Sequence, residues 1–167
     1  AEAMAELIYE DDSRIQVVYF SMSEANVERT LKLSYMAVCS DAGSYTNEGV
    51  FLSQSTHPRA YGSFARLLAH FVRDREVISL EEAVRRLTSL PASNLRLDRR
   101  GMLQEGYFAD IVVFDAAQVQ DHATFEEPHQ YATGITEVFV NGTQVIRDGE
   151  HTGATPGRFV KGPGYRE

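Results

Sequence analysis

The sequence predicts an α/β fold in which alternating helices and strands are followed by a small antiparallel β unit. Two patterns carry this prediction. Over residues 1–40, helical spacing alternates twice with short apolar runs, which is typical of βα units and of a parallel sheet. Towards the C-terminus, strand-like runs flank Asn141-Gly142, and this dipeptide is the strongest short signal for a β-hairpin.

The first part of the chain is expected to contain two helices and two strands. Residues 1–12 carry apolar side chains at helical spacing, and residues 15–20 are β-branched and aromatic, as in a strand. Either Ser21 or Ser23 can cap the next helix. The uncharged run 36–40 then predicts a buried strand, in which the lone cysteine of the chain would be a small buried hydrophobic residue.

The rest of the chain predicts two more helices and the β unit. Apolar residues on one face predict a helix over 65–75, and a capping box at Ser79 predicts another that stops at Pro91. Three strands are expected at 109–115, 135–140 and 144–147. We therefore predict two domains, residues 1–98 and residues 99–167.

Composition narrows the classes of partner. The 167 residues carry a formal net charge of −8, so the surface should repel nucleic acid and anionic membranes, and neither is expected as a partner. No apolar run approaches the roughly 18 residues of a membrane helix. A single cysteine allows no disulfide within the chain, and a cytoplasmic location is the simplest expectation.

Asp41 is the principal candidate for a catalytic residue. Small residues surround it, and in parallel sheets functional groups gather at the C-terminal ends of strands. Such a carboxylate can transfer protons, but it can equally cap the backbone N–H groups of a loop. Downstream, His57 and Arg59 could meet a substrate carboxylate, although both residues could also be solvated loop side chains. The histidine spacing indicates no metal site within the chain, apart from a possible contribution by Asp41.

A series of motifs resembles the C-terminal part of the N-acyl-D-amino-acid deacylases, the D-aminoacylases of the amidohydrolase superfamily. The Ala-Asp-Ile-Val-Val-Phe-Asp strand is shared widely across that superfamily, whereas the His-Pro-Arg-x-Tyr-Gly-x-Phe run and the Asp-Gly-Glu-His-Thr-Gly ending point more narrowly to the deacylases. The resemblance covers nearly the whole chain, and its motifs occur in order at 40–43, 57–64, 79–88, 106–115, 140–142 and 149–153.

This resemblance implies the last βα units of a TIM-type barrel over 1–98 and a share of a composite β-sandwich over 99–167. It also implies zinc-dependent hydrolysis of N-acyl-D-amino acids, with Asp41 as the acid–base group. Ala42 replaces the glycine usual in the family. A full barrel needs about 250 residues, so the zinc ligands are expected upstream of this chain. We therefore expect the chain to associate with the missing barrel portion or with itself, and to be inactive in isolation.

Two rival interpretations stay open. One is a related cyclic amidase of the hydantoinase or dihydroorotase type, because these enzymes share the superfamily strand. The other is a non-catalytic α/β interaction domain that uses its C-terminal β unit for assembly. A substrate panel separates the two enzymes, whereas a compact and stable oligomer without a catalytic partner would favour the interaction domain.

Overall fold

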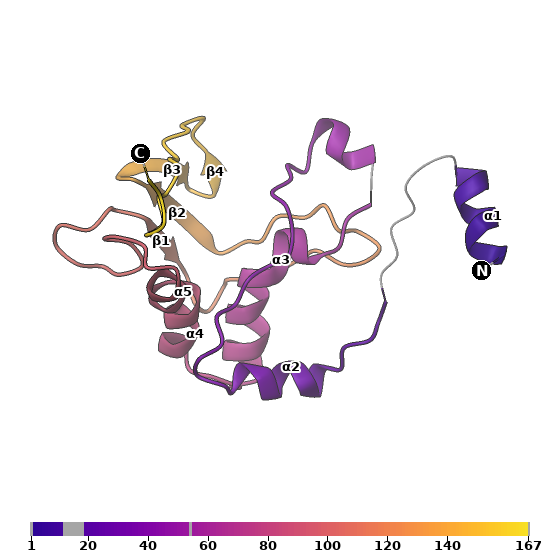
Figure 1. Ribbon diagram of the computed structural model, residues 1–167, viewed down its shortest axis with the longest axis horizontal. Coiled ribbons are helices and arrows are strands. Elements are labelled where there is room, and N and C mark those ends of the chain that lie inside the picture. The colour runs from indigo at the N-terminus through magenta and orange to yellow at the C-terminus, as the bar shows by residue number, and fades with distance from the viewer. Residues whose placement is uncertain (1, 12–18, 54, 167) are drawn as a thin grey trace.

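The computed structural model describes residues 2–11, 19–53 and 55–166. Helices occupy the first part of the described chain and an antiparallel sheet occupies the last part (Figure 1). The elements are α1 (Glu2–Asp11), α2 (Glu24–Leu31), the 3-10 helix η1 (Gly49–Ser53), α3 (Arg59–Arg66), the π-helix η2 (Leu67–Asp74), α4 (Leu80–Leu87), α5 (Ser89–Asn94), β1 (Ile111–Phe114), β2 (Ile135–Val140), β3 (Thr143–Arg147) and β4 (Glu150–His151).

Serine caps begin two of the predicted helices. Ser23, rather than Ser21, is the cap of α2, and its hydroxyl accepts a hydrogen bond from the backbone N–H of Asn26 at 3.3 Å. Ser79 caps α4 in the same way through the N–H of Glu82, also at 3.3 Å. A side-chain oxygen at this position satisfies one of the backbone donors that a helix start leaves unpaired.

The helix predicted over 65–75 differs in its start and in its geometry. It begins six residues earlier, at Arg59, and its second half is a π-helix, a rare form whose wider turns often occur near functional sites. The prediction that the next helix stops at Pro91 is wrong. The break falls at Thr88, and Pro91 lies in the first turn of α5, where its missing N–H costs no hydrogen bond.

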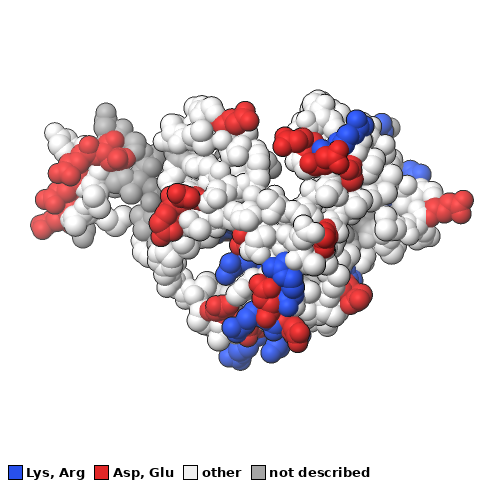
Figure 2. Space-filling model, turned by 180° about the vertical axis from the view of Figure 1, so that it is seen from behind, with Lys and Arg blue, Asp and Glu red and all other residues white. Residues whose placement is uncertain are grey.

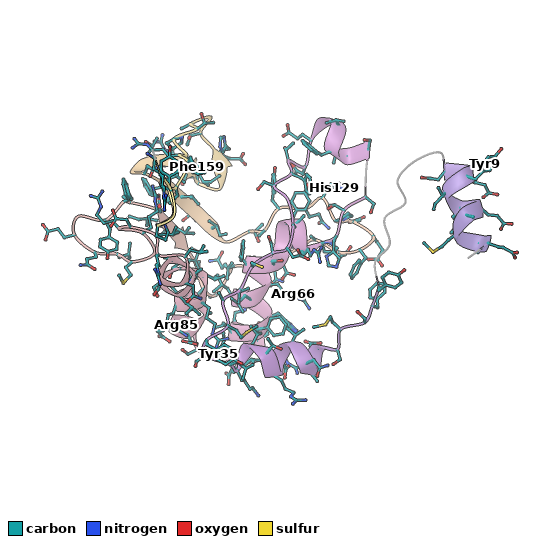
Figure 3. The ribbon with its side chains drawn as sticks, in the orientation of Figure 1. Tyr9, Tyr35, Arg66, Arg85, His129 and Phe159 are labelled. Carbon is teal, nitrogen blue, oxygen red and sulfur yellow. The ribbon has the colours of Figure 1, made fainter. Side chains whose placement is uncertain are left out.

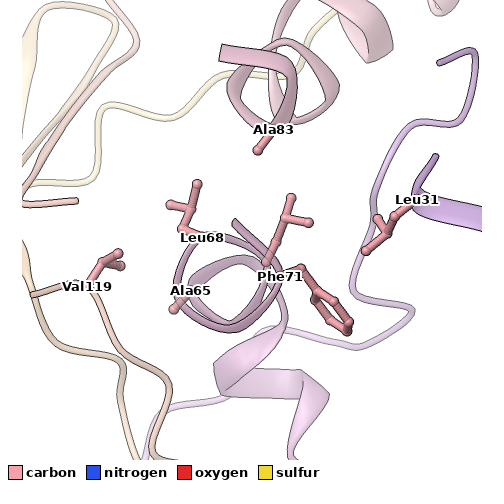
Figure 4. Close-up of a cluster of buried hydrophobic side chains, with 7 residues drawn as sticks. Leu31, Ala65, Leu68, Phe71, Ala83 and Val119 are labelled. Atoms are coloured by element: carbon pink, nitrogen blue, oxygen red, sulfur yellow. The ribbon is translucent and has the colours of Figure 1, made fainter. Parts of the chain in front are cut away.

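The core forms where α2, α3, η2 and α4 meet. Leu68 of η2 points towards Ala83 of α4, whereas the ring of Phe71 points away from Ala83, on the side of η2 where Leu31 of α2 lies (Figure 4). Val119, from the segment that joins β1 to β2, is fully buried on the other side of this cluster. The small alanine lets α4 approach η2 closely, so the four helices form one packed unit.

The C-terminal strands form a four-stranded antiparallel sheet in the order β1-β2-β3-β4. Asn141 and Gly142 join β2 to β3 with φ of +49° and +80°, the left-handed values that a two-residue hairpin turn needs. The turn between β3 and β4 repeats this geometry at Asp148-Gly149. The predicted antiparallel β unit is confirmed, although β1 is shorter than the predicted run 109–115.

The predicted parallel sheet is not found among the described residues. Residues 36–40 have no regular secondary structure and are not a buried strand; one backbone hydrogen bond joins them to α4, from Val38 N to Arg86 O at 3.5 Å. Cys39 is exposed, so the prediction that it is buried is wrong. A strand needs neighbours that pair with its backbone, and the described chain offers none here. The predicted strand 15–20 lies largely outside the described residues.

Charged side chains are unevenly distributed on the surface. Seen from behind, side chains of both signs crowd over α2 and the helices next to it (Figure 2). Arg75 pairs there with Glu28 at 2.6 Å, and His70 pairs with Glu24. Among the described residues, no helix is long and apolar enough to cross a membrane.

Candidate functional site

Asp41 stands at the end of the extended segment 36–40, in a left-handed conformation with φ of +50°. Aspartate adopts this conformation more readily than most residues, and it turns the chain sharply into the loop that follows. The side chain is 81% exposed, and its Oδ2 lies 3.0 Å from Nη1 of Arg59. The structure thus brings together two of the predicted site residues, separated by the loop of residues 42–58.

The start of α3 holds Arg59 in place. His57 Nδ1 accepts a hydrogen bond from the backbone N–H of Arg59 at 3.1 Å. The other face of the histidine packs edge-on against Phe125, with ring centroids 5.0 Å apart. Burial, and then the charge of Arg59, lower the pKa of His57, so both effects favour the neutral ring. Arg59 is therefore the cation of the site, and His57 binds its backbone N–H at the start of α3.

The remaining histidines are dispersed. His70 pairs with Glu24, His122 Nε2 lies 2.8 Å from the hydroxyl of Thr133, and His151 Nδ1 accepts from Gly153 N at 3.0 Å. Within the described ranges, no group of three or more His, Cys, Asp or Glu side chains is placed to hold a metal ion. The described residues alone therefore do not fit a zinc centre.

Sequence reasoning missed the aromatic residues around the loop. Tyr61, two residues after Arg59 on α3, lies 5.7 Å from Tyr131 between ring centroids and 5.9 Å from His129. Figure 3 shows His129 beside the upper end of α3. The tyrosine in the His-Pro-Arg-x-Tyr-Gly run was a usable signal for Tyr61, whereas no local pattern marks Tyr131.

Comparison with known proteins places this site in a family. The model of the family described as "Amidohydrolase family" matches residues 53–146, which include His57, Arg59, the strands β1 and β2, and all of β3 except its last residue. The chain belongs to the amidohydrolase family. This membership agrees with the resemblance drawn from the motifs.

Several curated relatives of this amidohydrolase are deacylases of N-acyl-D-amino acids. A D-aminoacylase from Alcaligenes xylosoxydans xylosoxydans is 43% identical over 86% of this chain. An N-acyl-D-aspartate deacylase from the same organism is 40% identical over 98% of the chain. The chain spans 28% and 32% of the length of these two relatives, respectively.

Solved structures give the same result. A crystal structure of D-aminoacylase superposes with a TM-score of 0.77 at 42% identity, over 85% of this chain and 28% of the other. An N-acyl-D-glutamate deacylase from Bordetella bronchiseptica, complexed with zinc and a phosphonate inhibitor, has a TM-score of 0.68 and covers 76% of this chain and 25% of the other. The described α/β arrangement with its small antiparallel sheet therefore matches part of the D-aminoacylase structure.

Proposed function

We propose that this amidohydrolase chain is part of a zinc-dependent deacylase that cleaves N-acyl-D-amino acids to a D-amino acid and a carboxylate. The pairing of Asp41 with Arg59 carries the proposal, because it sets a proton-transfer group beside a cation. The names of three relatives support the substrate class. One is a D-aminoacylase, and the other two are deacylases of N-acyl-D-aspartate and N-acyl-D-glutamate.

Asp41 is proposed as the general base and then the general acid. In hydrolysis, its carboxylate takes a proton from the water whose oxygen attacks the amide carbon. When the C–N bond breaks, the same carboxyl group gives that proton to the departing amine. A highly exposed aspartate can be reached by both water and substrate.

Arg59 is proposed to bind the α-carboxylate of the substrate. A guanidinium carries five N–H donors in a planar fork, and Asp41 Oδ2 lies against Nη1. A carboxylate can therefore bind the rest of the fork while the ion pair persists. That His57 contacts the substrate stays a prediction. Its Nδ1 already accepts a hydrogen bond from the backbone N–H of Arg59.

Zinc ligands are proposed to lie in polypeptide outside this chain, because the described residues do not supply a set. The same outside portion would provide the neighbouring strands of a TIM-type barrel, against which residues 36–40 could pair, and the other half of a composite β-sandwich. Helix α1 buries none of its residues among the described parts of the chain, and we propose that its apolar side chains pack against that portion. We therefore propose that the isolated chain neither binds zinc tightly nor turns over substrate. A cytoplasmic location is a separate proposal.

A cyclic amidase of the dihydroorotase type is the second candidate. A dihydroorotase from Lactobacillus acidophilus is 32% identical, but over 46% of this chain. The test is a substrate panel offered, with zinc, to the full-length enzyme that contains these residues. Hydrolysis of N-acetyl-D-amino acids without hydrolysis of L-enantiomers or dihydroorotate supports the deacylase, whereas turnover of cyclic amides alone refutes it.

A further inference from the structure

Two contacts hold the loop of residues 42–58 against α3. At its base, Arg59 meets Asp41. Above that pair, the hydroxyl of Tyr61 donates to the carbonyl oxygen of Thr46 at 3.0 Å. None of the described residues of this loop is fully buried, so these contacts, and not packing in the core, hold it in place.

Tyr131 adds a second clamp at the same point of the loop. Its hydroxyl oxygen accepts the backbone N–H of Asn47 at 3.2 Å and donates to Oγ1 of Thr46 at 3.3 Å. Tyr131 is 85 positions from Thr46 in the sequence, and its ring leans against that of Tyr61. Two hydroxyl groups from distant segments thus fix one short stretch of backbone, which has no regular secondary structure of its own.

The clamped loop carries an apolar surface. The ring of Tyr45 lies over Gly43, where a Cβ would come within 2.9 Å of its Cζ, and it packs against Phe51 with centroids 5.6 Å apart. Beside them, the side chains of Val50 and Leu52 are exposed. This surface, which we call the loop wall (Tyr45, Val50, Phe51 and Leu52), starts only four residues after Asp41.

The loop wall has the chemistry of a site for an apolar group. Residues 42–58 include no lysine or arginine, and their one charged residue is Glu48. A substrate with a second carboxylate would find no cation in this loop, and Glu48 would repel it. Arg66, at the C-terminal end of α3, is already paired with Asp121 at 3.3 Å.

We propose that Tyr61 and Tyr131 are positioning residues that hold the loop wall beside Asp41 and Arg59, and that this wall binds the apolar side chain of an N-acyl-D-amino acid. The inference rests on the proposed deacylase function for its substrate, but the clamp itself is a property of the chain. The two parts can therefore be tested separately.

The clamp is tested by amide hydrogen exchange on the 167-residue chain. Tyr131→Phe removes one oxygen, keeps the ring packing and leaves the Asn47 N–H without its acceptor. We expect this amide to exchange about tenfold faster, as loss of one hydrogen bond implies. Tyr165→Phe, in the C-terminal tail, is the control and should leave Asn47 unchanged. An unaltered Asn47 rate in Tyr131→Phe would overturn the clamp.

The substrate part is tested by kinetics on the full-length enzyme. Tyr131→Phe and the double variant with Tyr61→Phe should raise KM for N-acetyl-D-leucine about fivefold or more, with kcat nearly unchanged. KM for N-acetyl-D-glutamate should not rise, because the wall gives its carboxylate nothing to bind. A fall in kcat with constant KM, or an equal change for both substrates, would overturn this part. Absence of all deacylation would refute the proposed function and leave the exchange result to decide the clamp.

Discussion

Arg86 is a buried cation that we expect to lower the stability of the fold. Its side chain is 2% exposed and its Nε donates to Glu82 Oε1 at 2.8 Å. Its Nη1 is buried with no hydrogen-bond partner among the described residues. It lies three residues from Ala83, on the face of α4 that packs against the core.

We expect Arg86→Met to keep or raise the stability of the chain. An unsatisfied buried donor costs about 1–3 kcal/mol, and replacing buried ion pairs by apolar residues of similar volume is often neutral or stabilising. Glu82 is not orphaned by the change, because Arg85 Nε also binds it at 2.7 Å. The free energy of unfolding should therefore rise by up to about 1–3 kcal/mol.

The assay is urea denaturation followed by circular dichroism, with Arg86→Ala as the matched control. Both variants remove the charge, but alanine also leaves a cavity and should be about 2–5 kcal/mol less stable than the methionine variant. If Arg86→Met lowers the free energy of unfolding by more than about 2 kcal/mol, the arginine makes a net favourable contribution, and the reasoning from the orphaned donor is refuted.

Two further predictions concern Glu82 and Gly134. Hydrogen bonds from Arg85 and then Arg86 lower the pKa of Glu82 to about 2. The carboxylate therefore contributes stability that is complete above the unfolded pKa of about 4.3 and is lost as the pH falls towards 2. Urea midpoints measured down this range should fall less steeply in Glu82→Gln, and parallel slopes would contradict the assignment. In Gly134→Ala, a Cβ would lie 2.5 Å from the backbone of Val119, and φ is +82°. Gly142→Ala, with φ of +80° and nothing within 4 Å, isolates the conformational cost of about 1–2 kcal/mol. Thermal unfolding should show a larger loss for Gly134→Ala, and equal losses would exclude the clash.

The sequence predicted best those features that depend on residues adjacent in the chain. The cap at Ser79 and the turn at Asn141-Gly142 were predictable because each is set by a few adjacent side chains. The strand at 36–40 was not, because apolar composition cannot say whether a partner strand is present in the same chain.

Some residues of the site could likewise be predicted from the sequence, whereas others could not. Asp41 stood out as a carboxylate among small residues, and Arg59 as a cation downstream of it. Their ion pair was not predicted, and it forms because the two ends of the loop between them meet. The contact of Tyr131 with Thr46 spans 85 positions, and only the folded chain brings these residues together. The buried arginine was equally hidden, since Arg85 and Arg86 read alike in the sequence although only Arg86 is enclosed.

The proton-transfer role of Asp41 is the central claim, and Asp41→Asn tests it most directly. Asparagine keeps the size and the left-handed conformation of this residue but can neither accept nor deliver the proton. In the full-length enzyme, kcat for N-acetyl-D-leucine should fall by about 10²–10⁴-fold, with zinc content unchanged. Turnover within a few-fold of the native rate would contradict the account.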